Sequence, residues 1–545
     1  MCTKVVNGLS IVVLTMAALG ASPRDSRLAD AAQRSDVNAI RSLLNQHADV
    51  NGVQADGSTA LHWAVLHDDL KLTDQLLAAG ANVKAATRYN FTPLSLACTN
   101  GDAAIVERLI KAGADPNATS ANGETALMTA SLTGKTDAIK VLLSHGANVN
   151  VKEPFKGQTA LMFAASEGNT AAAAMLVEFG AQVKARSTKG YTALLFAVRN
   201  DHIETVKMLL DHGGNVNDVA PDSTSALNMA VLNAYFELAS VLLDRGADPN
   251  APDARGSALH TVAWLRKPGS DGAVGVGQLS RSTPIPEGNV TALELAQALL
   301  KHGANPNARI TWNEPRFDPE GGRARNPVDI NIGRHFLSYT GATPFYIAAR
   351  NGDAPLMRIL ADAGADPKMP TKAGITPLMV AAGLDAWPGE SPGPFTGVSE
   401  AERLDAVKLA VELGNDVNAH SNFSDFPITG DPKYTLLYYP LNMADVANKG
   451  LGDPRWNGVT PLISAVVSDQ PSIVKYLVDQ GAQLDAKTQL GWTALLVAEN
   501  GAFFANSKKD YPKAAEIIRK AMVQRGLLAA DQKVGGAPGA AEQSK

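Results

Sequence analysis

The amino-acid sequence predicts an all-α repeat solenoid, built from helix-turn-helix units that are joined by β-hairpin fingers. Three observations lead to this prediction. A phrase of Thr or Ser, then Ala or Pro, then an apolar residue recurs at intervals of 32–34 residues from Thr59 to Ser257. A second phrase, Gly-Ala followed by Asn, Asp or Gln, keeps a fixed register to the first, as at Gly80 and Gly113. Between these phrases each unit holds two apolar stretches of helical length.

Each position of the unit has a physical reason. The Thr or Ser is suited to cap the first helix, because its hydroxyl accepts a hydrogen bond from an otherwise unpaired backbone N–H. The first helix is rich in small residues, as in 161–165, which lets neighbouring units stack closely. The second helix carries a bulkier apolar stripe, as in 138–143. Gly146 then ends that helix in a left-handed conformation, and the chain leaves in an extended segment toward a finger.

These phrases resemble those of the ankyrin repeat, whose unit of about 33 residues opens with T-P-L-H-x-A. Thr59-Ala60-Leu61-His62 and Thr376-Pro377-Leu378 carry the opening, and the resemblance extends over nearly all of residues 28–525. It implies about 11 ankyrin repeats plus an N-terminal cap. It also implies a module that binds partners through its concave face and fingertips.

The first residues have the layout of a secretory signal. Lys4 precedes an apolar stretch at 9–19, and Ala18 and Gly20 supply small residues at the positions that a signal peptidase reads. The stretch is too short for a membrane-spanning helix, which needs about 20 residues. We therefore expect a cleavable signal peptide and a periplasmic or secreted protein; an apolar N-terminus of a cytoplasmic protein is the alternative.

The register of the phrases predicts the domain boundaries. The expected segments are a signal peptide at 1–22, an N-terminal capping repeat at 26–57, six regular repeats at 58–256, a repeat with two insertions at 257–341 (267–290 and 308–341), a repeat at 342–374, a second repeat with two insertions at 375–458 (385–399 and 419–458), a repeat at 459–491, a C-terminal capping repeat at 492–526, and a disordered tail at 527–545.

The two finger insertions, 308–341 and 419–458, are richer in aromatic residues than the whole chain, whose aromatic share is 6%. Aromatic and Arg side chains are enriched at protein interfaces. Two interpretations stay open, since these side chains suit either a small core for the loops or a contact with a partner. The candidate partner-binding residues are Arg88, Tyr89, Phe155, Lys156, Lys189, Tyr191, Trp312, Arg316, Phe317, Arg323, Arg325, Arg334, His335, Tyr434, Tyr438, Tyr439 and Trp456.

The histidines and cysteines do not suggest an enzyme. His62 and His260 hold the fourth position of the opening phrase, which predicts local hydrogen bonding. Cys2 would leave with the signal, so Cys98 is expected to be a small buried side chain, with a reactive thiol as the alternative. His335 lies in an Arg-rich insertion outside the repeat pattern, and an active-site role is the alternative for it. The glycine-rich stretch 272–277 does not open a helix after a strand, so we interpret it as a flexible loop.

The leading hypothesis is thus a non-catalytic scaffold for protein–protein interaction, with a periplasmic or extracellular protein partner. The net charge of −5 does not indicate binding to nucleic acid, which needs a basic surface. We expect no cofactor, no metal, no membrane span after signal removal, and a monomer. The alternatives are a small-ligand or enzymatic site in a lobe formed by the two finger insertions, and a secreted effector that acts on host proteins.

Overall fold

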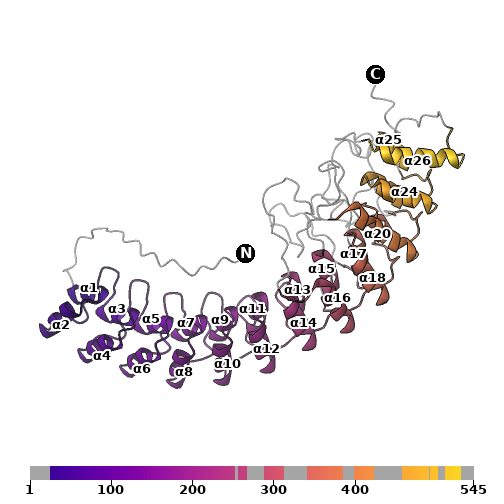
Figure 1. Cartoon of the computed structure of the whole chain (residues 1–545). Coiled ribbons are helices and arrows are strands. Elements are labelled where there is room, and N and C mark those ends of the chain that lie inside the picture. The colour runs from indigo at the N-terminus through magenta and orange to yellow at the C-terminus, as the bar shows by residue number, and fades with distance from the viewer. Residues whose placement is uncertain are drawn as a thin grey trace. The chain divides into compact units, whose positions relative to one another are not determined.

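The structure is a computed structural model, and it describes residues 25–251, 256–266, 288–311, 341–384, 398–422, 457–489, 491–500 and 510–529. These residues hold 24 helices, which form twelve consecutive pairs (Figure 1). The chain divides into two compact units, residues 1–189 and 190–545. The predicted all-α repeat solenoid, with a cap and 11 further repeats, is confirmed.

The first unit contains ten helices among its described residues: α1 (Arg27–Gln33), α2 (Val37–Asn45), α3 (Ala60–Leu66), α4 (Leu70–Ala78), α5 (Pro93–Asn100), α6 (Ala103–Lys111), α7 (Ala126–Thr133), α8 (Thr136–Ser144), α9 (Ala160–Ser166) and α10 (Thr170–Glu178). Odd-numbered helices form an inner row and even-numbered helices an outer row (Figure 1). Each inner helix contacts its own outer helix, and α1, α3, α5 and α7 each contact the inner helix of the next repeat.

The second unit contains, within its described part, α11 (Ala193–Arg199), α12 (Ile203–Asp211), α13 (Ala226–Leu232), α14 (Phe236–Asp244), α15 (Ala258–Leu265), α16 (Ala292–Lys301), α17 (Pro344–Arg350), α18 (Ala354–Asp362), α19 (Pro377–Ala381), α20 (Glu400–Glu412), α23 (Pro461–Val467), α24 (Pro471–Asp479), α25 (Ala494–Asn500) and α26 (Pro512–Gln524). The same pairing holds here: α19 packs on α23, and α20 packs on α24. No described helix has both the length and the apolar character that a membrane crossing requires.

Local chemistry sets both ends of each helix pair. Thr59 Oγ1 accepts a hydrogen bond from the backbone N–H of His62 at the start of α3. At the end of α4, the N–H of Ala81 donates to the carbonyl of Leu76 across a left-handed Gly80, whose φ is 88°. The inner helices bury small apolar side chains such as Ala64. The sequence therefore determines each pair locally, and close packing of small residues stacks one pair on the next.

A ladder of asparagine side chains joins neighbouring repeats. Asn117 Nδ2 donates to the carbonyl of Gly146, 3.1 Å away, and Asn117 Oδ1 accepts from the N–H of Asn148 at 2.8 Å. One amide side chain thus provides hydrogen-bond partners for two backbone groups of the next repeat. They are the carbonyl of the glycine after its outer helix and the N–H two residues later. We call this set the asparagine ladder; its members with both bonds are Asn51, Asn117, Asn150, Asn217, Asn250 and Asn307.

The fingers differ in one respect from the expected β-hairpins. The described residues show only isolated bridges, Thr119 with Thr125 and Val219 with Ser225. Most fingers have one backbone bond across their base, such as the one from Thr87 N to Phe91 O at 3.0 Å, and a turn bond inside it, here from Asn90 N to Thr87 O at 2.8 Å. With so few residues on each side of the turn, there is no room for the repeated pairing that makes a strand.

The two finger insertions begin and end at such a closed base. Ile310 N donates to Ala342 O at 3.0 Å, and Gly341 N donates to Ile310 O at 2.7 Å. Ser421 N pairs in the same way with Val459 O at 3.0 Å. These reciprocal bonds correspond to the bond that closes an ordinary finger. The repeat framework therefore continues on both sides of each insertion.

Candidate partner-binding surface

The fingers of the first unit project beyond the inner helices (Figure 1) and carry exposed aromatic side chains. Tyr89 is 66% exposed, and its neighbour Arg88 donates from Nη2 to the carbonyl of Ala55 on the preceding finger at 3.1 Å. That bond fixes the arginine stem between fingers, while the Tyr89 ring extends into solvent. Phe91, at the base of the same finger, is also exposed. Exposed aromatic side chains at rigid turns are suited to contact a partner.

A second exposed finger holds Phe155, which is 70% exposed, and Lys156 beside it. The turn is fixed by Glu153, whose buried carboxylate accepts the backbone N–H groups of Phe155 at 2.7 Å and Lys156 at 2.8 Å. Burial raises the pKa of Glu153, but these hydrogen bonds and a third from Gln158 outweigh it, and the pKa lies below its usual value. Glu153 is therefore ionised at neutral pH and holds Phe155 outward.

The inner helices of the first unit extend this surface. Trp63 on α3 is half-buried and donates from Nε1 to Gln54 Oε1 on its own finger at 2.7 Å. Leu66, one turn after Trp63 on α3, is exposed, and so is Leu132 at the equivalent position of α7. Phe163 on α9 is half-buried like Trp63. Fingers and inner helices thus present one partly apolar surface.

The corresponding face differs at α17 and α23 of the second unit. Ile347 and Ser464 hold the same helix position as Trp63, yet both are fully buried. Arg350 holds the position of Leu66 and is only 1% exposed, with its guanidinium 5.0 Å from the centre of the Trp264 ring. The inner-helix positions of α17 and α23 are therefore covered, whereas Trp63, Phe163 and, on α11 of the second unit, Phe196 are partly open.

The remaining predicted binding residues fall into two groups. Lys189 is exposed at a finger of the first unit, and Tyr191 in the second unit packs its ring 5.8 Å from the inner-helix residue Phe196. The other predicted residues lie outside the described residues; they are Trp312, Arg316, Phe317, Arg323, Arg325, Arg334, His335, Tyr434, Tyr438, Tyr439 and Trp456.

The two histidines of the opening phrase are structural. His260 Nδ1 accepts the backbone N–H of Ser257 at 3.0 Å, so its Nε2–H donates to the carbonyl of Ala342 at 3.1 Å. His62 does the same with Thr59 and Phe91. Burial lowers the pKa of His260 to about 4, which keeps the ring neutral at pH 7. The expected local hydrogen bonding is confirmed, and each ring also ties its helix to the next finger.

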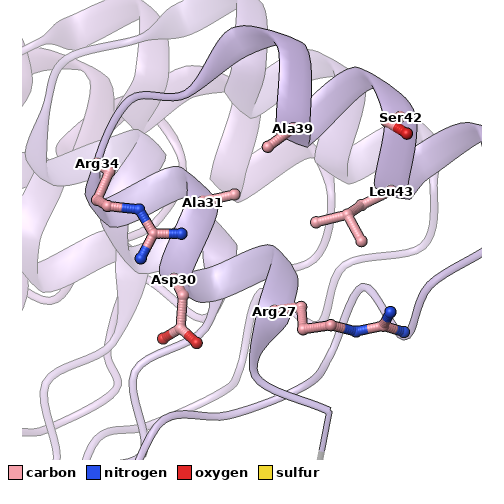
Figure 2. A pocket seen from close by; sticks show the side chains of 7 residues that line it. All are labelled: Arg27, Asp30, Ala31, Arg34, Ala39, Ser42 and Leu43. Carbon is pink, nitrogen blue, oxygen red and sulfur yellow. The ribbon is translucent and has the colours of Figure 1, made fainter.

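The described residues offer little for catalysis. They contain no group of His, Cys, Asp and Glu side chains that could hold a metal ion. Burial raises the pKa of the Cys98 thiol to about 12, which makes it an inert core side chain. Figure 2 shows an open depression on the first helix pair, where Arg27 is already paired with Asp25 and Asp30 accepts from Gln54 Nε2 at 2.7 Å. Two of its charged side chains are thus paired within the chain.

Comparison with protein families assigns most of this architecture. Residues 28–120, 94–187 and 179–253 match the family described as ankyrin repeats (3 copies), and residues 340–372 and 457–489 match the single ankyrin repeat. Together these matches cover more than half of the 545 residues. The chain belongs to the ankyrin-repeat family. Among solved structures it is similar to the crystal structure of the human ASB11 ankyrin repeat domain, with 28% identity over 41% of this chain and 99% of that chain, at a TM-score of 0.38. Curated proteins give no match.

Two features of this ankyrin-repeat chain were not among the sequence-based candidates. The asparagine ladder has a visible signal, since Asn follows the Gly-Ala phrase at a constant distance, as in Gly113 to Asn117 and Gly246 to Asn250. Lys152 and Arg186 were also missed. They lie on adjacent fingers, and Lys152 Nζ donates to the carbonyl of Arg186 at 2.8 Å. Their proximity arises only when the repeats stack.

Proposed function

We propose that this ankyrin-repeat chain is a non-catalytic scaffold that binds a periplasmic or extracellular protein partner through the fingers and inner helices of its first unit. Ankyrin repeats generally mediate protein–protein interaction, and this fold is typically not enzymatic. The observation that carries the proposal is the exposure of Tyr89 and Phe155 at fixed finger turns. An aromatic ring held in solvent by a buried carboxylate costs hydrophobic free energy, and a partner that covers the ring recovers it.

Site-specific photo-crosslinking tests this proposal. A benzophenone amino acid replaces Phe155 in one variant and Phe179 in a control variant. Phe179 is also exposed, at 46%, but it follows the outer helix α10 instead of a finger. Irradiation of cells should join a discrete protein to the chain at position 155 and none at position 179. Equal crosslinking at both positions, or none at either, would contradict the proposal.

The location outside the cytoplasm is a separate part of the proposal. It is supported by the apolar stretch at 9–19 after Lys4, with small residues following it. Mass spectrometry of the N-terminus after expression with its own leader should find a chain that starts near residue 23 in the exported fraction. An intact N-terminus in the cytosolic fraction would refute export.

The finger insertions 308–341 and 419–458, which belong to the second unit, are a further candidate contact for the partner. Their arginines and aromatic residues have the composition of interface residues. Removal of residues 312–340, between Ile310 and Gly341, should weaken partner capture and leave the repeats folded, because those two residues already close the finger base. Undiminished capture of the crosslinked partner by this deletion would show that the insertion does not contact the partner.

A further inference from the structure

Two adjacent fingers of the first unit, residues 149–158 and 183–189, concentrate positive charge. We call them the basic finger pair. They contain five cationic residues and one acidic residue, Glu153, although the whole chain has a net charge of −5. The cationic residues are Lys152, Lys156, Lys184, Arg186 and Lys189.

The two fingers are joined by specific contacts. Thr188 N donates to the carbonyl of Lys156 at 2.8 Å, and Lys152 Nζ donates to the carbonyl of Arg186 at 2.8 Å. Gly157 makes this approach possible: a Cβ at this position would meet Thr188 Oγ1 at 2.5 Å, and its φ is 65°. The structure therefore brings the cationic side chains of both fingers onto one continuous surface.

Three of the five positive charges on this surface, those of Lys156, Lys184 and Lys189, are left for an external partner. The carboxylate of Glu153 is buried and bonded to backbone N–H groups of its own turn. Lys156, Lys184 and Lys189 are exposed and form no ion pair within the described part of the chain, and the charge of Lys156 also helps to lower the pKa of the buried Glu153. Like charges on neighbouring fingers repel one another, and an acidic partner would relieve that repulsion.

Phe155 adds an apolar element at the centre of the surface. It is the most exposed large apolar side chain among the described residues, and it immediately precedes Lys156. We infer that the basic finger pair binds an acidic segment of the partner protein, which places an apolar or aromatic side chain against Phe155; this inference rests on the proposed function. The cations supply attraction and orientation, and the ring supplies buried apolar area.

The inference is tested with the full chain and defined polymers. The probes are a glutamate–tyrosine copolymer, polyglutamate and a single-stranded oligothymidine, each fluorescently labelled and titrated at low and at physiological salt. The copolymer should bind most tightly, and its affinity should fall with salt because the contact is electrostatic in part. The triple variant Lys156→Glu, Lys184→Glu, Lys189→Glu should weaken copolymer binding by roughly tenfold or more.

A matched control reverses three other cations of the same unit. Arg41, Lys71 and Lys140 are exposed on the outer helices α2, α4 and α8. The variant Arg41→Glu, Lys71→Glu, Lys140→Glu carries the same change in net charge, so it should bind the copolymer within about twofold of the unchanged chain. Circular dichroism verifies that both triple variants are folded.

Each remaining outcome has a definite meaning. Equal weakening by both triple variants would overturn the inference in favour of net-charge attraction. Oligothymidine that binds as tightly as the copolymer would overturn it in favour of nucleic acid. If the copolymer does not bind while the crosslink at position 155 persists, the acidic-segment inference fails and the proposed function stands.

Discussion

His260 makes the stability of the second unit depend on pH. The ring is 1% exposed, and burial lowers its pKa from 6.5 to about 4. In the unfolded chain the ring titrates near its usual value, so between pH 6.5 and 4 the unfolded state binds the extra proton. The contribution of His260 to the free energy of unfolding is therefore fully present above pH 6.5 and is lost as pH falls toward 4. At about 1.4 kcal/mol per unit of pKa difference, acidification from pH 7 to 4.5 should cost about 2–3 kcal/mol.

The assay is urea unfolding of the full chain by circular dichroism at several pH values from 7 to 4.5. The variant His260→Gln has no titrating ring at this position. Its free energy of unfolding should therefore fall by about 2–3 kcal/mol less over this pH range than that of the unchanged chain. The control His212→Gln removes an exposed histidine of the same unit, whose ring bonds only the carbonyl of Met208 among the described residues, and leaves the buried ring of His260 in place, so the loss assigned to His260 should remain. The reasoning is refuted if His260→Gln retains that loss, or if the control lacks it.

Three further predictions concern the framework and its thiol. Leu109→Ala, at a fully buried site on α6, should lower the free energy of unfolding by about 2–5 kcal/mol in urea titration. Asn117→Ala removes two bonds of the asparagine ladder and should cost about 1–2 kcal/mol, whereas Asn122→Ala at a finger turn should cost under about 0.5 kcal/mol. In a Cys2→Ser background, Cys98 should react with a chromogenic disulfide reagent only after unfolding, because burial raises its pKa to about 12.

The framework could be predicted because each repeat encodes it locally. A Thr hydroxyl at position 59 caps the helix that follows it, and Gly80 adopts the left-handed conformation wherever its repeat lies. These interactions reach only a few residues along the chain. The sequence pattern therefore reveals both the residue and its role.

The surface was harder to predict because its properties depend on distant residues. Phe163 and Ile347 hold equivalent positions and are both apolar, but only Ile347 is fully buried. Lys156 and Lys189 were expected at the binding surface as separate finger residues. Their membership in one basic cluster follows from contacts between fingers about 33 residues apart, such as Thr188 N to Lys156 O.

The asparagine ladder also says something about how this chain could have changed over time. Asn250 Nδ2 bonds the carbonyl of Gly303 at 2.8 Å, and Asn307 Nδ2 bonds that of Gly364 at 2.9 Å, although long segments separate each pair in sequence. Each bond uses one side chain and the main chain of the next repeat, so it does not depend on the sequence in between. A recombination event, or a protein engineer, can thus lengthen, shorten or exchange these segments while the repeats keep their alignment. New binding specificities can be acquired without redesigning the framework.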